Sequence, residues 1–279
     1  MSAKVKFYMF PGSNSAYTGR LMLEHKGIEY KTVKLPPGPH AFIMLGLGFE
    51  TMGVPALKVD GRRVQGTRAI SRFLDQMVPG RPLFPDDPVM RKHVEDAERW
   101  GEEFQNATRR IFYVGAKRDR KAFASVMTPE RALPMRVFIR VGRPLLIRLA
   151  SGAHRASDDA VREDLELLPE RLDQMDRWIE QGLLNGPQLN AADFQIAPNI
   201  SALLRCDDLA RLITGRPAAA LARRVAPDYP GHLGPVFPPE LLAGPQPGTS
   251  SPGNDGDESV RRAAGVDDAS IDTIVRPGG

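Results

Sequence analysis

Residues 11–15 read Pro-Gly-Ser-Asn-Ser, a turn-forming segment that carries two hydroxyl groups. A serine at the start of a helix can donate a hydrogen bond to an anion and place it in the favourable field of the helix dipole. Together with Val54-Pro55 and with Gly66-Thr67, which opens another predicted helix, this segment predicts one cleft suited to a small acidic thiol. Ser13 is the main candidate for stabilising the thiolate, and Ser15 is the expected N-cap. The alternative is that Ser13 only forms a turn or caps the helix.

The remaining reactive side chains predict no other chemistry. The single cysteine, Cys206, excludes an intramolecular disulfide and lies in an apolar helical stretch, so we expect it to be buried and inert. The five histidines show no metal-ligand spacing, and no metal site is predicted. No P-loop, dinucleotide fingerprint or Gly-x-Ser-x-Gly motif is present.

Composition narrows the class of protein. The chain has 279 residues, of which 42% are hydrophobic, enough for a buried core. The net charge of +4 is mildly basic, but aromatic residues are only 7% and do not alternate with basic ones, so no nucleic-acid binding is predicted. No secretory signal and no uncharged stretch of about 20 apolar residues is seen. We therefore expect a soluble, cytoplasmic protein with no stable membrane insertion.

The elements that must position these residues lie in the first 80. Alternation predicts a strand over 4–10, a helix over 15–26 and a second strand over 28–35. A proline-rich break follows, and then a short helix or loop over 42–47. Strands over 54–60 and 62–65 flank Asp60-Gly61, a strong hairpin signal, and a helix capped by Thr67 runs to residue 77.

The rest of the chain is predicted to be helical. We expect an α/β domain at 1–80, a linker at 81–88, an all-helical domain at 89–226, a proline-rich arm at 227–247 and a disordered tail at 248–279 with a weak amphipathic stretch at 260–275. Helical periods cover 88–117, 131–150, 158–181, 190–205 and, more weakly, 208–225. Asn190 and Asp193 have the spacing of a capping box.

An arginine-rich stretch, 131–148, has Arg136, Arg140 and Arg143 at helical spacing among apolar residues. It suits acidic lipid or the lip of a pocket for an apolar, anionic molecule. Because Pro134 and Pro144 would interrupt a long amphipathic helix, we instead favour a helix packed on the core with a solvated arginine face.

The first 80 residues resemble the thioredoxin-like N-terminal domain of the glutathione S-transferase superfamily, and the helical half is similar to the all-α domain of that family. The resemblance extends from residue 4 to about 205. The matching segments are Phe7–Pro11 with Ser13, Leu23 with Lys26–Tyr30, Val54–Leu57 with Asp60-Gly61, Thr67–Ile70 with Phe73-Leu74, and Leu184–Gly186 with Asn190–Asp193.

The resemblance implies roles for several residues in binding glutathione. Ser13 lies where the serine-type classes, zeta and phi among them, carry the catalytic hydroxyl. A cis Val54-Pro55 bond would present backbone groups to the cysteinyl part, and Thr67 would receive the γ-glutamyl carboxylate at a helix N-terminus. Gly66 departs from the usual Glu or Gln and offers only its backbone amide to that end. His40 would form a salt bridge with the glycyl carboxylate, or is simply a surface histidine.

The other classes of the family fit less well. The phenol of the tyrosine-type classes would fall at Met9, and Tyr8 next to it points to the opposite face of the strand, so Tyr8 is predicted to be structural. The cysteine-type classes carry their catalytic thiol near the position of residue 13, and Cys206, the single cysteine of this chain, is far from it in the sequence.

The resemblance therefore implies an enzyme that conjugates or adds glutathione, its co-substrate, to an electrophilic, apolar small molecule. It implies a dimer and a role in detoxification. We expect the acceptor to lie between the 10–17 loop and helices around Trp100, Phe104 and Phe112. The alternatives are a non-enzymatic binding or interaction protein with the same fold, or a transferase that uses another low-molecular-weight thiol.

Overall fold

The computed structural model describes residues 3–127 and 133–242. The tail expected at 248–279, with its stretch at 260–275, lies outside the described residues, and so does the end of the arm at 243–247. The elements of the first part of the chain are β1 (Val5–Met9), α1 (Asn14–His25), β2 (Lys31–Lys34), α2 (His40–Gly46), β3 (Ala56–Val59), β4 (Arg62–Gln65) and α3 (Thr67–Met77).

The four strands form one mixed sheet in the order β2-β1-β3-β4. β1 pairs parallel with β2 and antiparallel with β3, and β3 pairs antiparallel with β4. Asp60 and Gly61 join β3 to β4 with positive φ at both residues, as a tight hairpin turn requires. This topology confirms the thioredoxin-like α/β domain predicted from the sequence.

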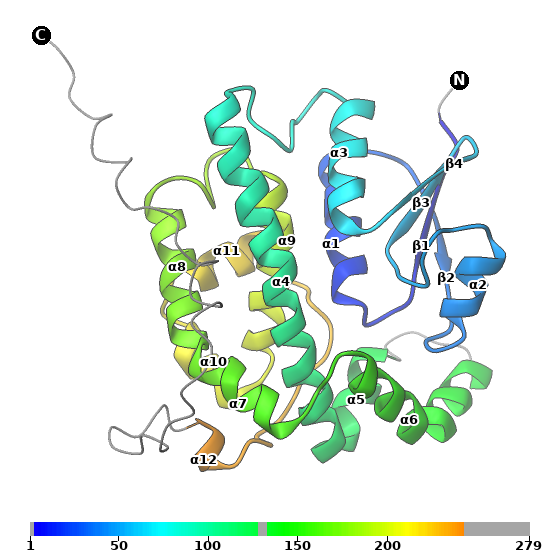
Figure 1. Cartoon of the computed structure of the whole chain (residues 1–279), viewed down its shortest axis with the longest axis vertical. Coiled ribbons are helices and arrows are strands. Elements are labelled where there is room, and N and C mark those ends of the chain that lie inside the picture. Colours follow the sequence, from blue (N-terminus) through cyan, green and yellow to red (C-terminus); the bar gives the residue numbers. More distant parts are fainter. Residues whose placement is uncertain (1–2, 128–132, 243–279) are drawn as a thin grey trace, which may run out of the picture. The chain divides into compact units, whose positions relative to one another are not determined.

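Alternating residues of the sheet enter two separate cores. Phe7 and Leu57 belong to the large core on the side of α1 and α3, whereas Tyr8 and Ala56 pack with Met44 of α2 on the other side. In Figure 1, α1 and α3 lie between the sheet and the helices labelled α4 and α9, and α2 lies on the other side of the sheet. The buried position of Tyr8 confirms that it is structural and leaves no phenol from β1 on the α1 side.

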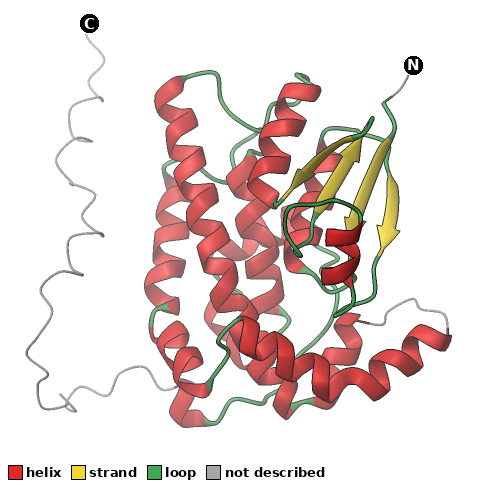
Figure 2. Ribbon diagram, turned by 45° about the vertical axis from the view of Figure 1, so that its right-hand side comes forward, coloured by secondary structure: helices red, strands yellow, loops and turns green. Residues whose placement is uncertain are grey.

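The second part is helical, and Figure 2 shows its helices beside the sheet. Its elements are α4 (Pro88–Arg118), α5 (Arg120–Met127), α6 (Leu133–Ala153), α7 (Asp158–Glu166), α8 (Leu168–Glu180), α9 (Ala191–Leu204), α10 (Asp207–Ile213), α11 (Pro217–Val225) and α12 (Pro239–Leu242). Within the described ranges, none of the helices has the length and apolar character needed to cross a membrane.

The expected helices over 158–181 and 208–225 are each split in two. Leu167 separates α7 from α8, whose second residue is Pro169, and a turn at 214–216 separates α10 from α11, which begins at Pro217. Proline has no N–H for the preceding helical turn but fits the first turn of a new helix, so each break falls just before a proline.

α9 forms the centre of the helical part. Nearly all of its residues are buried, and it packs against α1, α4, α10 and α11. Its N-terminus confirms the capping box: Asn190 Oδ1 accepts from the Asp193 N–H at 3.3 Å, and Asp193 Oδ2 accepts from the Asn190 N–H at 2.9 Å. Asn199 of α9 accepts a hydrogen bond from Asn14 Nδ2 at 2.5 Å, which ties the start of α1 to the helical core.

α6 differs from its prediction. The helix is continuous over 21 residues and contains Pro144, and Pro134 lies at its second position, where no N–H is needed. Prolines therefore do not interrupt it, since Pro144 removes only one internal hydrogen bond. Its outer face is also not a solvated arginine face alone, because Val141, Leu145 and Leu149 are exposed there.

Candidate functional site

Ser13 ends the loop at 10–13 that joins β1 to α1 and is the residue just before the helix. Its backbone is extended, with φ −76° and ψ 113°, and its Oγ accepts a hydrogen bond from the Ala16 N–H at 3.2 Å. Ser13, and not Ser15, is therefore the N-cap of α1, because the helix begins at Asn14. The observed N-cap therefore lies two residues before the expected one, and both serines are at the N-terminus of the helix.

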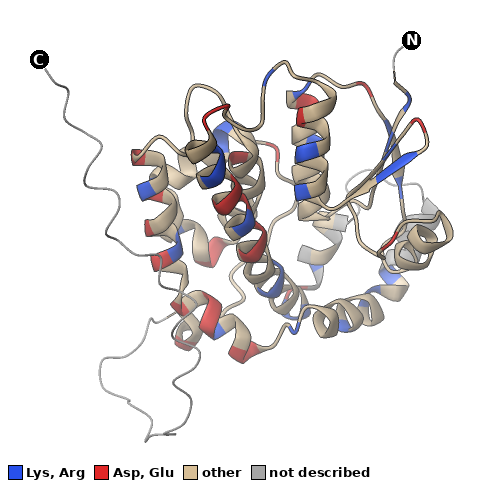
Figure 3. Ribbon diagram, turned by 45° about the horizontal axis from the view of Figure 1, so that its top comes forward, with Lys and Arg blue, Asp and Glu red and all other residues tan. Residues whose placement is uncertain are grey.

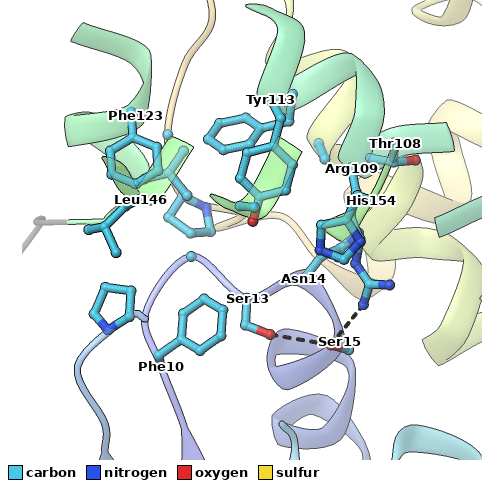
Figure 4. Close-up of a pocket in the computed structure, with 18 of the residues that line it drawn as sticks. Phe10, Ser13, Asn14, Ser15, Thr108, Arg109, Tyr113, Phe123, Leu146 and His154 are labelled. Carbon is cyan, nitrogen blue, oxygen red and sulfur yellow. Dashed lines mark hydrogen bonds between the residues drawn. The ribbon is translucent and has the colours of Figure 1, made fainter. Parts of the chain in front are cut away.

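The hydrogen bonds of Ser15 determine which of the two serine hydroxyls donates to the other. Ser15 Oγ donates to the Val54 carbonyl at 3.1 Å and accepts from Arg109 Nη2 at 3.2 Å. Ser13 Oγ lies 3.2 Å from Ser15 Oγ. Since the single proton of Ser15 is directed to Val54, Ser13 is the donor of this pair. Its cap uses only a lone pair, so the Ser13 proton can turn toward an anion in the cavity (Figure 4).

The Val54–Pro55 peptide bond is cis, as the resemblance implies. Within the described residues, the Val54 N–H has no backbone hydrogen-bond partner. The loop before it is held by Gln65, whose Nε2 donates to the carbonyls of Thr51 and Gly53, each at 2.7 Å, and whose Oε1 accepts from the Thr51 N–H at 3.0 Å. The Val54 amide is therefore held in place by a fixed loop, and its N–H is available to a bound peptide.

The start of α3 is only partly as expected. Gly66, with φ 90°, is the N-cap of α3, and Thr67 is its first residue with a buried side chain. The Gly66 N–H donates to the Pro55 carbonyl at 2.9 Å, so we correct the expectation that this amide holds the γ-glutamyl end. No side chain caps α3, which leaves the amides of its first turn to receive an anion.

His40 begins α2 and lies against Phe10, with 4.6 Å between the ring centres. Its Nδ1 accepts a hydrogen bond from the Gly38 N–H at 3.1 Å, and burial lowers the pKa of the imidazole. Both observations favour the neutral ring with a proton on Nε2. His40 can thus donate a hydrogen bond to a carboxylate near pH 7, but the salt bridge expected from the sequence needs a cation that this environment disfavours.

Ser13, His40 and Val54 line one cavity of about 570 Å³. Its walls come from the loop after β1, the segments before α2 and β3, the helices α4, α5 and α6, and the chain at 229–233. Pro55, Gly66 and Thr67 are not among its lining residues, so the start of α3 lies outside it. Phe112 lines the cavity as expected, but Trp100 and Phe104 stack on each other within the helical core, with 5.4 Å between ring centres.

Arg109 of α4 places a positive charge in this cavity. Its Nη2 donates to Gln105 Oε1 at 2.7 Å as well as to Ser15, and its Nη1 donates to Asn106 Oδ1 at 3.2 Å. Across the described part of the chain, no carboxylate lies within salt-bridge distance of it, and burial lowers its pKa. A partly buried cation held by neutral groups favours an anion nearby.

Aromatic groups surround this cation in the cavity. Tyr113 stacks on His154, the residue that follows α6, with ring centres 5.4 Å apart and an interplanar angle of 9°. Burial raises the pKa of both Tyr113 and Tyr229, so the two phenols stay protonated and can donate hydrogen bonds. Burial, Arg109 and Arg110 lower the pKa of His154 to about 4, so its ring is neutral near pH 7.

Two further expectations concern cysteine and metals. Cys206 is buried, which confirms that part of the expectation, and burial raises the pKa of its thiol to about 12, which favours an unreactive, protonated thiol. Among the described residues, no group of three or more His, Cys, Asp and Glu side chains could hold a metal ion.

A model of the family "Glutathione S-transferase, N-terminal domain" matches residues 7–82, the part that contains the sheet, α1 and Ser13. This part of the chain is a glutathione S-transferase N-terminal domain. No curated protein sequence matches it.

Several solved structures share the glutathione S-transferase fold. The β-etherase LigF from Sphingobium sp. strain SYK-6 is 18% identical with a TM-score of 0.56, over 78% of this chain and 93% of LigF. FzlA from C. crescentus is 16% identical with a TM-score of 0.50, over 88% and 94%. A rice glutathione S-transferase in complex with glutathione is 17% identical with a TM-score of 0.50, over 80% and 86%. At these identities the likeness is one of fold.

Within this glutathione S-transferase fold, the structure adds residues that the sequence did not single out. Gln105, Arg109 and Tyr113 follow one another at intervals of four in α4 and so lie on one face of the helix. That spacing was a usable signal for a polar stripe on an otherwise packed helix. His154 and Tyr229 carried no comparable signal, because only the fold brings α6 and the 229–233 segment to this cavity.

Proposed function

We propose that this chain binds glutathione with its thiol at Ser13 and transfers it to an electrophilic, largely apolar molecule in the cavity. The observation that carries the proposal is the Ser13 hydroxyl, which lines the same cavity as Arg109 and whose proton takes no part in the helix cap and is shared only with Ser15. The fold of the superfamily and the presented Val54 amide support it.

The proposed roles combine what the family resemblance implies with the contacts described above. Ser13 donates to the sulfur, and the N-terminus of α1 and the Arg109 cation stabilise its negative charge. Val54 pairs with the cysteinyl backbone, Thr67 and the first-turn amides of α3 receive the γ-glutamyl carboxylate, and neutral His40 donates to the glycyl end. The thiolate then forms a carbon–sulfur bond with the acceptor. In a substitution, the bond from this carbon to the leaving group breaks, and the leaving group keeps the electron pair. In an addition, the electron pair of the acceptor's double bond moves to the neighbouring carbon, which takes up a proton from water.

The context of the protein belongs to the same proposal. We propose a homodimer in the cytoplasm, with conjugation of reactive apolar compounds as its task. Light scattering after gel filtration tests the dimer.

Calorimetric titration of glutathione tests the binding. We expect Thr67→Ala to weaken binding roughly 5- to 30-fold, because a hydrogen bond to a charged group contributes about 1–2 kcal/mol. Ser13→Ala should bind glutathione but lose transfer to a chromogenic aryl halide. Transfer unchanged in Ser13→Ala contradicts the catalytic assignment.

The same titration of glutathione distinguishes the proposed function from two alternatives. Gly66 lacks the side chain that would contact the γ-glutamyl group, which favours either a different thiol or a non-enzymatic binding protein. Absence of glutathione binding with turnover of another thiol supports the first alternative. Absence of turnover with any thiol supports the second.

A further inference from the structure

The outer face of α6 exposes apolar side chains at a regular interval. Val141, Leu145 and Leu149 are 75%, 61% and 60% exposed, and their spacing of four places them in one stripe along the helix. Ile147 on the inner side is buried against α4 and α5 residues. A stripe of exposed apolar side chains on a helix whose opposite side packs against the protein marks an interaction surface.

The charge around this stripe has one sign. Residues 120–156 contain eight Arg or Lys and one acidic residue, Glu130, although the whole chain carries only +4. The rest of the chain is therefore net negative, and the positive charge is concentrated around α6. Figure 3 shows basic positions and no acidic position along the ribbon of this helix. Exposed Arg148 lies within the stripe and exposed Arg140 borders it.

The stripe is continuous with the mouth of the cavity. Leu149 belongs to the stripe and also lines the cavity, next to Leu146 and Ala150. Met52, on the sheet side of the same cavity, is 48% exposed. Gly38 approaches Leu146 so closely that a Cβ at this glycine would lie 2.7 Å from Leu146 Cδ2. Exposed Leu149 and Met52 therefore lie at the edge of an apolar cavity, and Leu149 joins this edge to the stripe.

We propose that α6 lies on the surface of an anionic lipid bilayer, with its apolar stripe at the acyl boundary and its arginines at the phosphates. Arginine with apolar residues and no carboxylate is the composition of an interfacial helix, whereas a soluble protein partner would require no such excess of one charge. The docking stands independently of the proposed function. Its consequence, that the acceptors are apolar electrophiles dissolved in the membrane, rests on that function.

Co-sedimentation with vesicles tests the docking without glutathione. The full chain should bind vesicles of phosphatidylcholine with phosphatidylglycerol, bind phosphatidylcholine alone weakly, and dissociate as salt is raised. Arg140→Gln/Arg148→Gln should weaken binding roughly 10- to 30-fold, since each arginine near such a surface contributes about 1 kcal/mol. Val141→Ser/Leu145→Ser should weaken it to a similar degree.

Matched controls come from other exposed positions. Val89→Ser/Leu212→Ser removes two exposed apolar side chains from α4 and α10, and Lys31→Gln/Lys34→Gln removes two exposed charges from β2. Both controls should bind the anionic vesicles like the wild type. Thermal melts exclude loss of folding in each variant.

Three results would overturn the docking. The first is that the wild type does not bind anionic vesicles, and the second is that the α6 variants and their controls lose binding equally. The third is that the wild type does not bind lipid and Val141→Ser/Leu145→Ser changes the oligomeric mass, which would show that a second copy covers the stripe. Conjugation rates test separately whether the acceptors come from the membrane. Val141→Ser/Leu145→Ser should conjugate a water-soluble acceptor at the rate of the wild type and a vesicle-dissolved acceptor more slowly. Equal rates for both would contradict only that consequence, and no turnover with either would contradict the proposed function.

Discussion

Ser13 combines two tasks that use different parts of one hydroxyl group. Its oxygen lone pair caps α1 through the Ala16 N–H, and its proton points to Ser15, whose own proton is directed to the Val54 carbonyl. The arrangement fixes the Ser13 side chain and leaves its proton in a hydrogen bond to a neutral oxygen, which a stronger acceptor can replace. An anion in the cavity competes only with a neutral serine oxygen for that proton, and a charge-assisted bond is the stronger of the two.

His154 gives the cavity a pH-dependent contribution to stability. Its pKa is lowered from 6.5 to about 4, so between these values the unfolded chain binds more protons than the folded one. The free energy of unfolding therefore rises with pH through this window, and the contribution is lost as the pH falls from 6.5 to about 4. Because the ring is partly exposed, we expect about 1–2 kcal/mol, below the full value of the shift.

The comparison with His154→Phe measures this contribution. Phenylalanine preserves the stacking on Tyr113 and does not titrate. Urea unfolding at a series of pH values gives the free energy of unfolding at each pH. Between pH 4 and 6.5, this free energy should rise less steeply with pH for the variant than for the wild type. His25 and His40, whose pKa values burial also lowers, contribute equally to both proteins and cancel. Equal slopes would show that His154 titrates normally in the folded protein.

At the scale of elements, α9 depends on its capping box. Asn190 accepts from two amides of the first turn and donates to the Leu183 carbonyl at 2.8 Å. We expect Asn190→Ala to lower the free energy of unfolding by about 1–2 kcal/mol, because it leaves helix amides unsatisfied at a buried end. Chemical denaturation measures it. Ser157→Ala, at the more exposed cap of α7, should cost less, and an equal or smaller loss at Asn190 would contradict the central role of α9.

The elements that the sequence predicted well are those with strong local signals. Alternation found β1, Asp60-Gly61 found the β3–β4 hairpin, and the capping box found the start of α9. Breaks were missed at Leu167 and at the turn before Pro217, where apolar periodicity continues across a loop of only one to three residues. α6 was misjudged because proline rules describe isolated helices, whereas Pro144 lies in a helix held by packing of Ile147 and Leu146.

At the scale of the whole molecule, the cavity joins parts that lie far apart in the sequence. Ser13, His40 and Val54 could be predicted because they belong to one local domain with a characteristic order of elements. Arg109, His154 and Tyr229 come from α4, the turn after α6 and the chain after α11. Their meeting is fixed only when α9 packs against both α1 and α4. Tertiary packing of this kind has no signature in local periodicity, so the cation in the cavity was not anticipated.

The pKa of the thiol of bound glutathione, followed by the ultraviolet absorbance of the thiolate, tests the central claim most directly. A free thiol has a pKa near 8.5, and we predict a value about two units lower on the wild type, a difference of about 2.7 kcal/mol. Ser13→Ala should return at least about one unit of that shift, as expected for one charge-assisted hydrogen bond. Ser157→Ala, which removes the same kind of cap far from the cavity, should leave the value unchanged. A bound thiol with the same pKa in the wild type and in Ser13→Ala would contradict the account.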